Sequence, residues 1–337
     1  MNRILNDLPE VEKGKPSTRF SRLMVVVFAF IAAVFLYLAL RGLDWRNFFA
    51  TLKNARYVYL PITLLWSTAS FFLRALRLRV LLSSETPVPI MNVFRANMAG
   101  YLGNSILPAR AGELVRAAYL GRRNNVSVSF ALAVGLVERL MDLVTLIVLG
   151  SIALSSAGIV SPLFQNALKG ISIFGLIGLA AIFILPRLDG LVRRLILALP
   201  MLKETHKLKL DNFLQQFISG LRSLHSFSRA AQFIALTGLI WLMDALGTVF
   251  LAFVLKIPLL SQQAFVLLSA LGLSSAIPST PGYVGVYQFV AVTALAPFGI
   301  SRADALAFIL ISQILGYLLI GFWGLLSVWQ FNKQPEA

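Results

Sequence analysis

The sequence contains no cysteine, which excludes disulfide bonds, thiolate nucleophiles and cysteine-ligated metal centres. Histidine is scarce as well, because His206 and His225 are the two in the chain and both lie in a basic stretch. A histidine-rich metal centre is therefore not expected, and no metal or cofactor is predicted. Acidic residues are few: 14 Asp and Glu stand against 30 Lys and Arg, which gives a formal net charge of +16.

The chain is also poor in polar residues. Of its 337 residues 58% are hydrophobic, and the mean hydropathy is +0.80. A soluble domain holds about 45–50% apolar residues even when glycine is counted, so the bulk solvent of this chain is lipid. The calculated pI of about 10.7 would suggest nucleic acid in a soluble protein. Here the cations indicate anionic lipid headgroups instead, and no nucleic acid is expected.

Apolar segments predict an all-α polytopic membrane protein with about six spanning helices. These segments cover residues 23–40, 57–73, 128–155, 171–186, 231–255 and 303–330. The first has no small-residue cleavage site and is interpreted as a retained span rather than a secretory signal. Two more apolar stretches, 91–120 and 262–297, are interrupted by proline and glycine. Because irregular backbone is tolerated at membrane depth only where protein or water covers it, both are predicted to be re-entrant or broken-helix hairpins.

A single transmembrane domain is expected over residues 23–330, with tails at 1–22 and 331–337. The first tail carries five Lys and Arg and segment 187–229 carries eight, whereas loop 156–170 carries one. The positive-inside rule therefore places both termini and segment 187–229 in the cytoplasm, and the chain in the cytoplasmic (inner) membrane. Within that segment apolar residues recur at helical spacing from Leu210 to Leu224. They predict an amphipathic helix that either lies on the cytoplasmic leaflet or packs on the bundle.

An internal repeat is indicated by two similar stretches half a chain apart. NSILPARAG, residues 104–112, aligns without gaps on SSAIPSTPG, residues 274–282, at an offset of 170 residues. The flanking spans match at nearly the same offset, which divides the domain into halves at about 23–155 and 171–330. Counting crossings makes the first broken segment enter from the cytoplasm and the second from outside. The halves are therefore expected to be inverted, an arrangement typical of transporters.

Three motif blocks carry a family resemblance: LPARAGELVRAAYL (107–120), VERLMDLV (137–144) and IPSTPGYVGVYQ (277–288). They resemble the three motif blocks of the lysylphosphatidylglycerol synthase transmembrane region, a flippase-like family. The resemblance covers nearly the whole chain, with the spans in the same order. The resemblance implies membrane lipids as partners, among them anionic phospholipid, aminoacylated phosphatidylglycerol and hopanoid or polyprenyl-type lipids. Because the chain ends seven residues after Gln330, the aminoacyl-transferase domain of the full synthase and lipid aminoacylation are not expected. The oligomeric state stays open.

The resemblance also marks individual positions as functional. They are Pro108, Arg110, Gly112, Glu113 and Arg116 in the first block, Glu138, Arg139 and Asp142 in the second, and Pro278, Pro281, Gly282 and Gly285 in the third. The chain departs from the family pattern at Tyr283, where a second glycine is frequent, and at Gln288, where glutamate is frequent. Without that carboxylate, specificity for a cationic headgroup does not carry over directly, and Gln288 is kept as a candidate polar lining.

Charged residues within apolar spans are expensive, at least ~2.5–3.5 kcal/mol each at the bilayer centre. Glu138 and Asp142 lie at i and i+4 on one helix face and require a cation between them, which Arg110, Arg116 or Arg139 would supply. Two compatible interpretations stay open. The charges form either a buried ion network that sets helix registry or a polar lining that binds a lipid headgroup.

Other charges in the spans have different expected roles. Asp244 stands alone in its span and either partners an arginine or titrates and couples transport to protons. Arg74, Arg77 and Arg79, at the end of the second predicted span, are interpreted as positive-inside anchors that extend to lipid phosphates.

The prolines and glycines predict where helices stop and restart. Pro108 and Pro278 end a helix, while Gly112, Gly282 and Gly285 allow tight turns. A helix that restarts after such a turn presents free amides that suit a phosphate. Arg110 and Arg116 would add bidentate contacts, so the first stretch is interpreted as a headgroup-binding hairpin.

Three classes of function remain. The first is a flippase or transporter that moves a polar or anionic, phosphate-bearing lipid between leaflets. The second is an accessory protein that scaffolds an envelope lipid pathway. The third is a membrane-embedded lipid-linked transferase with Glu113, Glu138 or Asp142 as base. No catalytic motif is recognised, so no enzyme activity is expected, and a lateral cleft lined by Arg110 and Glu138 would favour the first class.

Overall fold

The computed structural model describes residues 18–107, 111–124, 126–156, 184–197, 204–275 and 281–333, and the single positions 173, 177 and 180. Within these residues the chain forms helices and no strands, in agreement with the predicted all-α class. The fourth predicted crossing, 171–186, falls mostly outside the described residues. So do Pro108, Arg110 and Pro278 of the motif blocks.

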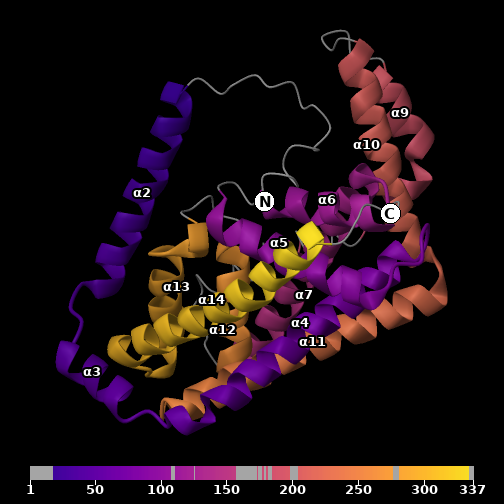
Figure 1. Cartoon of the computed structure of the whole chain (residues 1–337). Helices are drawn as coiled ribbons and strands as arrows, with labels where there is room; N and C mark the ends of the chain where they lie inside the picture. The colour runs from indigo at the N-terminus through magenta and orange to yellow at the C-terminus, as the bar shows by residue number, and fades with distance from the viewer. Residues whose placement is uncertain are drawn as a thin grey trace.

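Helices of the first half run from α2 to α7. They are α2 (Thr18–Leu40), α3 (Trp45–Lys53), α4 (Leu60–Leu82), α5 (Ile90–Ile106), α6 (Gly112–Asn124) and α7 (Val128–Ser156), with a short 3-10 turn, η1 (Tyr57–Tyr59), before α4. In Figure 1, α2 stands at one edge of the molecule, and α3 connects its end to the central bundle.

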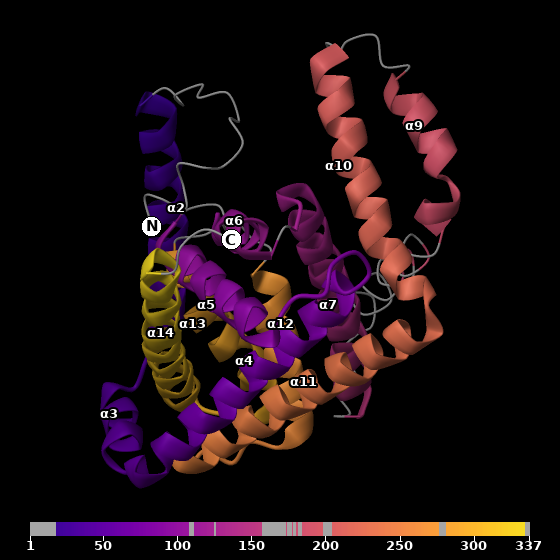
Figure 2. The ribbon, with the colours of Figure 1, turned by 45° about the vertical axis from the view of Figure 1, so that its right-hand side comes forward.

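The second half contains the remaining helices. They are α9 (Asp189–Leu197), α10 (Glu204–Arg222), α11 (Phe227–Val254), α12 (Ser261–Ser274), α13 (Val286–Leu295) and α14 (Arg302–Lys333), with 3-10 turns η3 (Leu185–Arg187), η4 (Ser223–His225), η5 (Pro281–Tyr283) and η6 (Ala296–Phe298). Helices α9 and α10 form a hairpin that projects away from the bundle (Figure 2).

In the part of the chain that the structure describes, three helices have the length and apolar composition of a membrane span: Tyr57–Leu82, Phe227–Val254 and Arg302–Lys333. They correspond to the segments predicted at 57–73, 231–255 and 303–330. The helix that matches the 57–73 segment continues to Leu82 instead of ending at residue 73, and it therefore contains Arg74 and Arg77. Helix α7 is 29 residues long but carries three charges near its middle. An integral membrane protein follows from these helices, while the full set of six spans stays a prediction.

Both stretches that were predicted to be broken are broken. Helices α5 and α6 pack against each other across the break that follows Ile106, and α12 packs against α13 across the break that follows Ser274. The first pair approaches closely, since a Cβ placed on Gly112 would lie 2.0 Å from the carbonyl oxygen of Gly100. Neither stretch is one continuous helix. Their re-entrant course in a membrane stays a prediction.

The turn before α13 has an unusual backbone. Gly282, Tyr283 and Gly285 have φ angles of 77°, 58° and 87°, in the left-handed region that glycine tolerates and other residues rarely adopt. A Cβ on Gly285 would also lie 2.2 Å from the carbonyl oxygen of Ala32 in α2. Glycine at 285 therefore serves both the turn and the contact between α2 and α13.

Helices α4 and α11, which the predicted repeat makes equivalent, pack side by side (Figure 1 and Figure 2). At one end, the amide of Arg56, just before α4, donates to the carbonyl of Val254 at the end of α11, at 2.8 Å. Towards the other end, Arg77 of α4 lies 3.4 Å from the hydroxyl of Thr237 in the first half of α11. The two helices are therefore antiparallel.

Between these contacts, Arg74 pairs with Asp244, which lies 170 residues further along the chain. This separation equals the offset of the repeat, so each residue contacts its own counterpart. A contact of this kind is expected near a two-fold axis that relates two inverted repeats. The other contacts are reciprocal as well, since α7 packs on α12 and α14 packs on α5. An inverted repeat explains these relations and stays a prediction.

Within the described residues, the buried apolar side chains form two main clusters. The first centres on α4, α5, α6 and α7, with Phe130 and Tyr119 among its large buried side chains, and also takes Phe233 from α11 and Phe331 from α14. The second joins α11, α12, α13 and α14 and also takes Phe48 from α3.

The amphipathic helix predicted in segment 187–229 is α10. Its second half packs on α7, where Ile218 and Leu221 are buried. In its first half Leu208, Leu210 and Phe213 are exposed. Packing on the bundle is thus observed for part of the helix, and contact of the exposed part with a leaflet stays a prediction.

Candidate functional site

Six charged side chains from α4, α6 and α7 form a chain of ion pairs with alternating sign. In order along the chain they are Asp142, Arg77, Glu138, Arg116, Glu113 and Arg139. Three guanidinium groups balance three carboxylates, so the set is formally neutral. The cross-helix contact between arginine and carboxylate that the sequence predicted is present, for example between Arg116 and Glu138.

The buried end of this ion-pair chain is held by Arg77. Its Nη1 and Nη2 donate to the two carboxylate oxygens of Asp142 at 2.6 and 2.9 Å, and Nη2 lies 3.4 Å from Oε1 of Glu138. The guanidinium also lies 5.2 Å from the ring centre of Phe233 in α11. Because the Arg77 side chain is only 2% exposed, the interpretation of this residue as an anchor that extends to lipid phosphates is wrong.

Arg116 occupies the middle of the ion-pair chain. Its Nη1 donates to Oε2 of Glu138 at 3.0 Å, and its Nη2 lies 2.8 Å from Oε2 of Glu113. Gly135 in α7 provides the space, since a Cβ at that position would lie 2.1 Å from Nη2 of Arg116. Arg116 is therefore buried and engaged with two carboxylates, and its predicted contact with substrate stays a prediction.

We expect Gly135→Ala to destabilise the protein by about 1–3 kcal/mol, because the new methyl group pushes Nη2 of the buried Arg116 guanidinium away from Glu113. Gly238→Ala is the matched control, since its Cβ would meet nothing within 4 Å on α11. Replacing glycine by alanine inside a helix, with no other effect, stabilises the protein by roughly 0.5–1 kcal/mol. Unfolding in detergent micelles compares the two variants, and equal stability of both would contradict the assignment of Gly135.

The other end of the ion-pair chain is open. Nη2 of Arg139 donates to Oε1 of Glu113 at 2.8 Å, and the two side chains are 39% and 26% exposed. Arg139 lines a cavity of about 390 Å³ between the two halves. Of the arginines in this set, Arg139 is the one that can meet a ligand without leaving its partner.

A second ion pair joins α4 to α11 beside this cavity, which Arg74 lines, while Asp244 lines a neighbouring hollow. Nη2 of Arg74 pairs with Oδ2 of Asp244, while the hydroxyl of Ser70 donates to Oδ1 of Asp244 at 2.6 Å. Arg74 also lies over the ring of Trp241. The arginine partner that the sequence allowed for Asp244 is thus present. Arg74 is an ion-paired wall residue and not an anchor at a membrane surface, which corrects the sequence interpretation, and proton coupling through Asp244 stays a prediction.

This cavity, called here the central cavity, is lined by both broken segments and by α4, α7 and α14. Among the described residues, its polar lining comprises Arg74, Tyr101, Asn104, Ser105, Arg139, Ser275, Tyr283, Tyr287, Ser312, Gln313 and Tyr317. Binding pockets for small molecules typically measure about 300–1,000 Å³. The central cavity therefore has the size and the donor groups to take a polar headgroup.

Hydrogen bonds hold the turn of the second hairpin against α14. The carbonyl of Gly282 accepts from Nε2 of Gln313 at 3.1 Å and from the hydroxyl of Tyr317. Nε2 of Gln288 donates to Oε1 of Gln313 at 2.5 Å, and Oε1 of Gln288 accepts from the amide of Gly285 at 2.7 Å. Gln288 is 2% exposed and supports the wall from behind, whereas Gln313 lines the cavity in its place.

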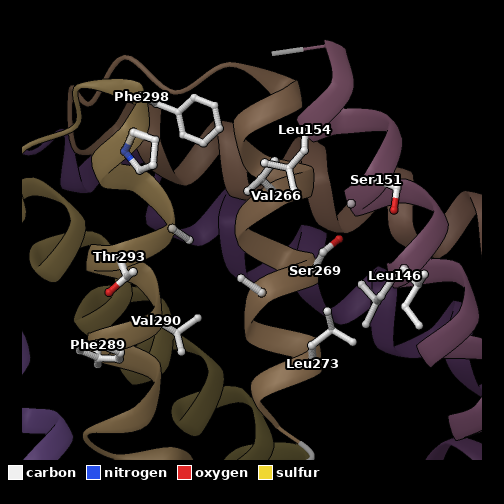
Figure 3. A pocket seen from close by; sticks show the side chains of 15 residues that line it. Leu146, Ser151, Leu154, Val266, Ser269, Leu273, Phe289, Val290, Thr293 and Phe298 are labelled. Atoms are coloured by element: carbon white, nitrogen blue, oxygen red, sulfur yellow. The ribbon is translucent and has the colours of Figure 1, made fainter. Parts of the chain in front are cut away.

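Two further hollows adjoin the helices of this site. One, of about 230 Å³ between α4, α11 and α14, shares Phe71, Arg74, Ser312 and Gly316 with the central cavity. The other, of about 270 Å³, is an apolar groove between α7, α12 and α13, and Figure 3 shows Leu146, Leu273 and Val290 among its walls. Polar groups are few there, so the groove suits hydrocarbon.

The structure thus brings Glu113, Arg116, Glu138, Arg139 and Asp142 into one network and places Asp244 in a separate pair. Gly112, Pro281, Gly282 and Gly285 lie at the two helix breaks, and the roles of Pro108, Arg110 and Pro278 stay predictions. Within the described part of the chain, no three His, Asp or Glu residues gather as a metal site would require.

Sequence reasoning missed Arg77, Gln313 and the tyrosines of the cavity wall. A signal for Arg77 was present, since extending the second span to the usual length of roughly 20 residues places it inside the membrane. Tyr283 was noted as a departure from the family glycine but without a role in a binding site. For Gln313 and the other tyrosines there was no signal, because their importance depends on which helices face each other.

Comparison with known proteins confirms the family resemblance. The model described as lysylphosphatidylglycerol synthase TM region matches residues 24–324. The glycosyltransferase AglD of Haloferax volcanii is 26% identical over 238 residues, which are 61% of this chain but 38% of AglD. The UPF0104 membrane protein MJ1078 of Methanocaldococcus jannaschii is 25% identical over 239 residues, 69% of this chain and 97% of that protein. No solved structure matches.

Proposed function

This chain belongs to the lysylphosphatidylglycerol synthase transmembrane family of membrane proteins, and from that premise we propose that it moves a phosphate-bearing lipid between leaflets. The headgroup passes through the central cavity while the lipid tails remain in the bilayer. The cytoplasmic membrane and cytoplasmic termini, expected from the distribution of Lys and Arg, are part of this proposal.

The central cavity is the observation that carries the proposal. It lies between two broken segments, and its wall includes Arg74 and Arg139. Arginine presents a planar fork of donors that matches a phosphate, and a half-exposed ion pair allows an incoming phosphate to share the guanidinium. We assign the phosphate contact to Arg139 first, because its side chain is 39% exposed. Arg110, which the sequence favoured, stays a further candidate.

Alternation between the two leaflets requires a fold with two related halves. The antiparallel packing of α4 and α11, and the contact of Arg74 with Asp244 at the repeat offset, support an inverted repeat. In such repeats, rocking of one half against the other exposes a central site to each side in turn. The apolar groove of Figure 3 lies on the same α12–α13 hairpin and offers a surface for a lipid tail.

A transferase is the second candidate, because one relative is named as a glycosyltransferase. Its base would be Glu113, Glu138 or Asp142. Each of these carboxylates is paired with at least one arginine, so its oxygens already accept hydrogen bonds and are poorly placed to take a proton from a substrate. The ion pairs therefore favour transport.

Filling the cavity tests the proposal. We expect Gly316→Trp to abolish lipid movement in reconstituted liposomes, because Gly316 lines both the central cavity and its neighbour and has open space around it. Gly238→Trp is the matched control, since a Cβ there also meets nothing within 4 Å but lies on α11 away from both cavities. The control should move lipid at the wild-type rate.

The assay follows fluorescent or chemically trappable lipids across a panel of anionic and polyprenyl-phosphate species. Both variants must first show equal folding in detergent. If the wild-type protein moves none of these lipids, the accessory role becomes the better explanation. If Gly316→Trp and Gly238→Trp move lipid equally, the central cavity is not the route.

A further inference from the structure

Two stacked tyrosines form part of the wall of the central cavity. The rings of Tyr283 and Tyr287 lie 4.7 Å apart with an angle of 9° between their planes, and both residues line the cavity. The face of an aromatic ring is electrostatically negative, so it receives a cation or the C–H groups of a sugar or polyol ring, and not a phosphate. This part of the wall therefore faces a different portion of the ligand from the arginines.

Tyr283 occupies a backbone conformation that suits glycine. Its φ is 58°, and positive φ is an outlier for a bulky residue. Lys256 also has a positive φ, but it follows the end of α11, where a left-handed residue commonly terminates a helix. Tyr283 instead lies at the end of η5, in the turn that leads to α13. Strained residues of this kind are held by the surrounding structure and cluster at binding sites, so the backbone of Tyr283 points to a role for its side chain.

The two rings are held in place by the surrounding turn. The carbonyl of Gly282, next to Tyr283, accepts from Gln313 and from the hydroxyl of Tyr317. The amide of Gly285 donates to Gln288, which in turn donates to Gln313. Because these bonds tie the turn to α13 and α14, the rings form a rigid surface that loses little freedom on binding.

The charges that line the central cavity indicate whether a cation or a neutral ring contacts the two tyrosines. Of the described residues that line the central cavity, Arg74 and Arg139 are charged, and none is a carboxylate. Their carboxylate partners, Asp244 and Glu113, are not part of this lining, so an ammonium group in this space would meet the guanidinium groups first and be repelled by them. A neutral ring with hydroxyl groups is not repelled, and it can exchange hydrogen bonds with Gln313 and Tyr317.

We infer that Tyr283 and Tyr287 bind the neutral, polyhydroxylated part of the headgroup, a sugar or cyclic polyol, while Arg139 and Arg74 bind its phosphate. The inference rests on the proposed function, because it concerns the same cavity. It makes Tyr283 and Tyr287 the residues that determine which phosphate-bearing lipid is taken. An aminoacylated lipid, with its ammonium group, is the poorer ligand.

Binding of short-chain lipids to the purified protein tests this assignment by native mass spectrometry. Dihexanoyl phosphatidylinositol carries a phosphate and a cyclic polyol, dihexanoyl phosphatidic acid a phosphate alone, and dihexanoyl phosphatidylethanolamine a phosphate and an ammonium group. We expect the inositol lipid to bind roughly three- to tenfold more tightly than phosphatidic acid, the range of an aromatic contact. Competition by soluble inositol 1-phosphate shows whether the headgroup suffices without the acyl chains.

Tyr283→Gly separates binding from folding. Glycine suits the positive φ, so the variant should be no less stable than the wild type. It should lose the preference for the inositol lipid and bind phosphatidic acid unchanged. Tyr283→Phe keeps the ring and should retain most of the preference. Tyr59→Ala removes a tyrosine that packs on Phe250 and Phe253 at the start of α4, and serves as the control for loss of an aromatic ring.

Two results would overturn the inference. One is binding of phosphatidylethanolamine as tight as that of phosphatidylinositol in the wild type. The other is an equal loss of phosphatidylinositol and phosphatidic acid binding in Tyr283→Gly. A protein that prefers the inositol lipid but moves no lipid in liposomes would contradict the proposed function and leave this inference standing.

Discussion

Replacement of Arg77 by glutamine is expected to cost about 3–5 kcal/mol of unfolding free energy, the usual effect of removing one partner from a buried ion pair. Arg77 holds Asp142 through two hydrogen bonds and also contacts Glu138. Without its charge, the two carboxylates face each other on one side of α7 while nearly excluded from water. Glu138 retains Arg116, so Asp142 bears most of the penalty.

The measurement is unfolding of purified protein in mixed micelles as the denaturing detergent is increased. Arg222→Gln is the control, because Arg222 forms an ion pair with Asp189 at 3.0 Å in which its side chain is 54% exposed. Exposed pairs contribute about 0–1 kcal/mol, so this variant should resemble the wild type.

A double variant shows whether the penalty arises from the unpaired charge. Asp142→Asn added to Arg77→Gln removes the carboxylate that would be left alone, and should recover part of the lost stability. If Arg77→Gln were no more destabilising than Arg222→Gln, the ion pairs of α4 and α7 would not hold these helices together. If the loss of unfolding free energy in the double variant equalled the sum of the losses in Arg77→Gln and Asp142→Asn, the two residues would not interact.

Arg139→Lys is expected to lower the rate of lipid movement at least tenfold without an equal loss of stability. The substitution keeps the positive charge, but lysine presents a point charge in place of the planar fork that binds phosphate with two parallel hydrogen bonds. The partner of Arg139, Glu113, also contacts Arg116 and so remains paired in the variant. The effect should therefore appear in transport and not in folding.

Arg222→Lys provides a close comparison. The Arg222–Asp189 pair resembles the Arg139–Glu113 pair in distance and in exposure of the carboxylate, but lies in the α9–α10 hairpin. Both variants are reconstituted in liposomes at matched folding and tested with phosphate-bearing lipids. Equal rates for the two would show that Arg139 does not contact the phosphate, and the assignment would move to Arg74 or Arg110.

Much of the organisation of this protein could be predicted from local sequence patterns. Hydropathy marked the segments that became α4, α11 and α14, because each must be apolar along most of its length to lie in lipid. Proline and glycine marked both helix breaks, since these residues limit or free the backbone wherever they stand. The motif blocks identified the family that the comparison confirmed. Each of these signals is contained within a short stretch of chain.

Only the tertiary structure decided which charges meet. The sequence offered Arg110, Arg116 and Arg139 as partners for Glu138 and Asp142, and treated Arg77 as a surface anchor. In the structure Arg77, from a different helix, supplies the bidentate contact to Asp142. Pairing of this kind depends on the rotation and separation of neighbouring helices, and no spacing within one helix encodes it.

The same reason explains the cavity wall. Tyr283 was visible in the sequence as a departure from the family glycine, but its stacking on Tyr287 and its place beside Gln313 and Tyr317 depend on how the second hairpin rests on α14. By itself the sequence determined a helical membrane protein with two broken segments and buried charges. The packing of one half against the other determined which arginines reach the central cavity, because side chains far apart in the chain become neighbours only when the helices assemble.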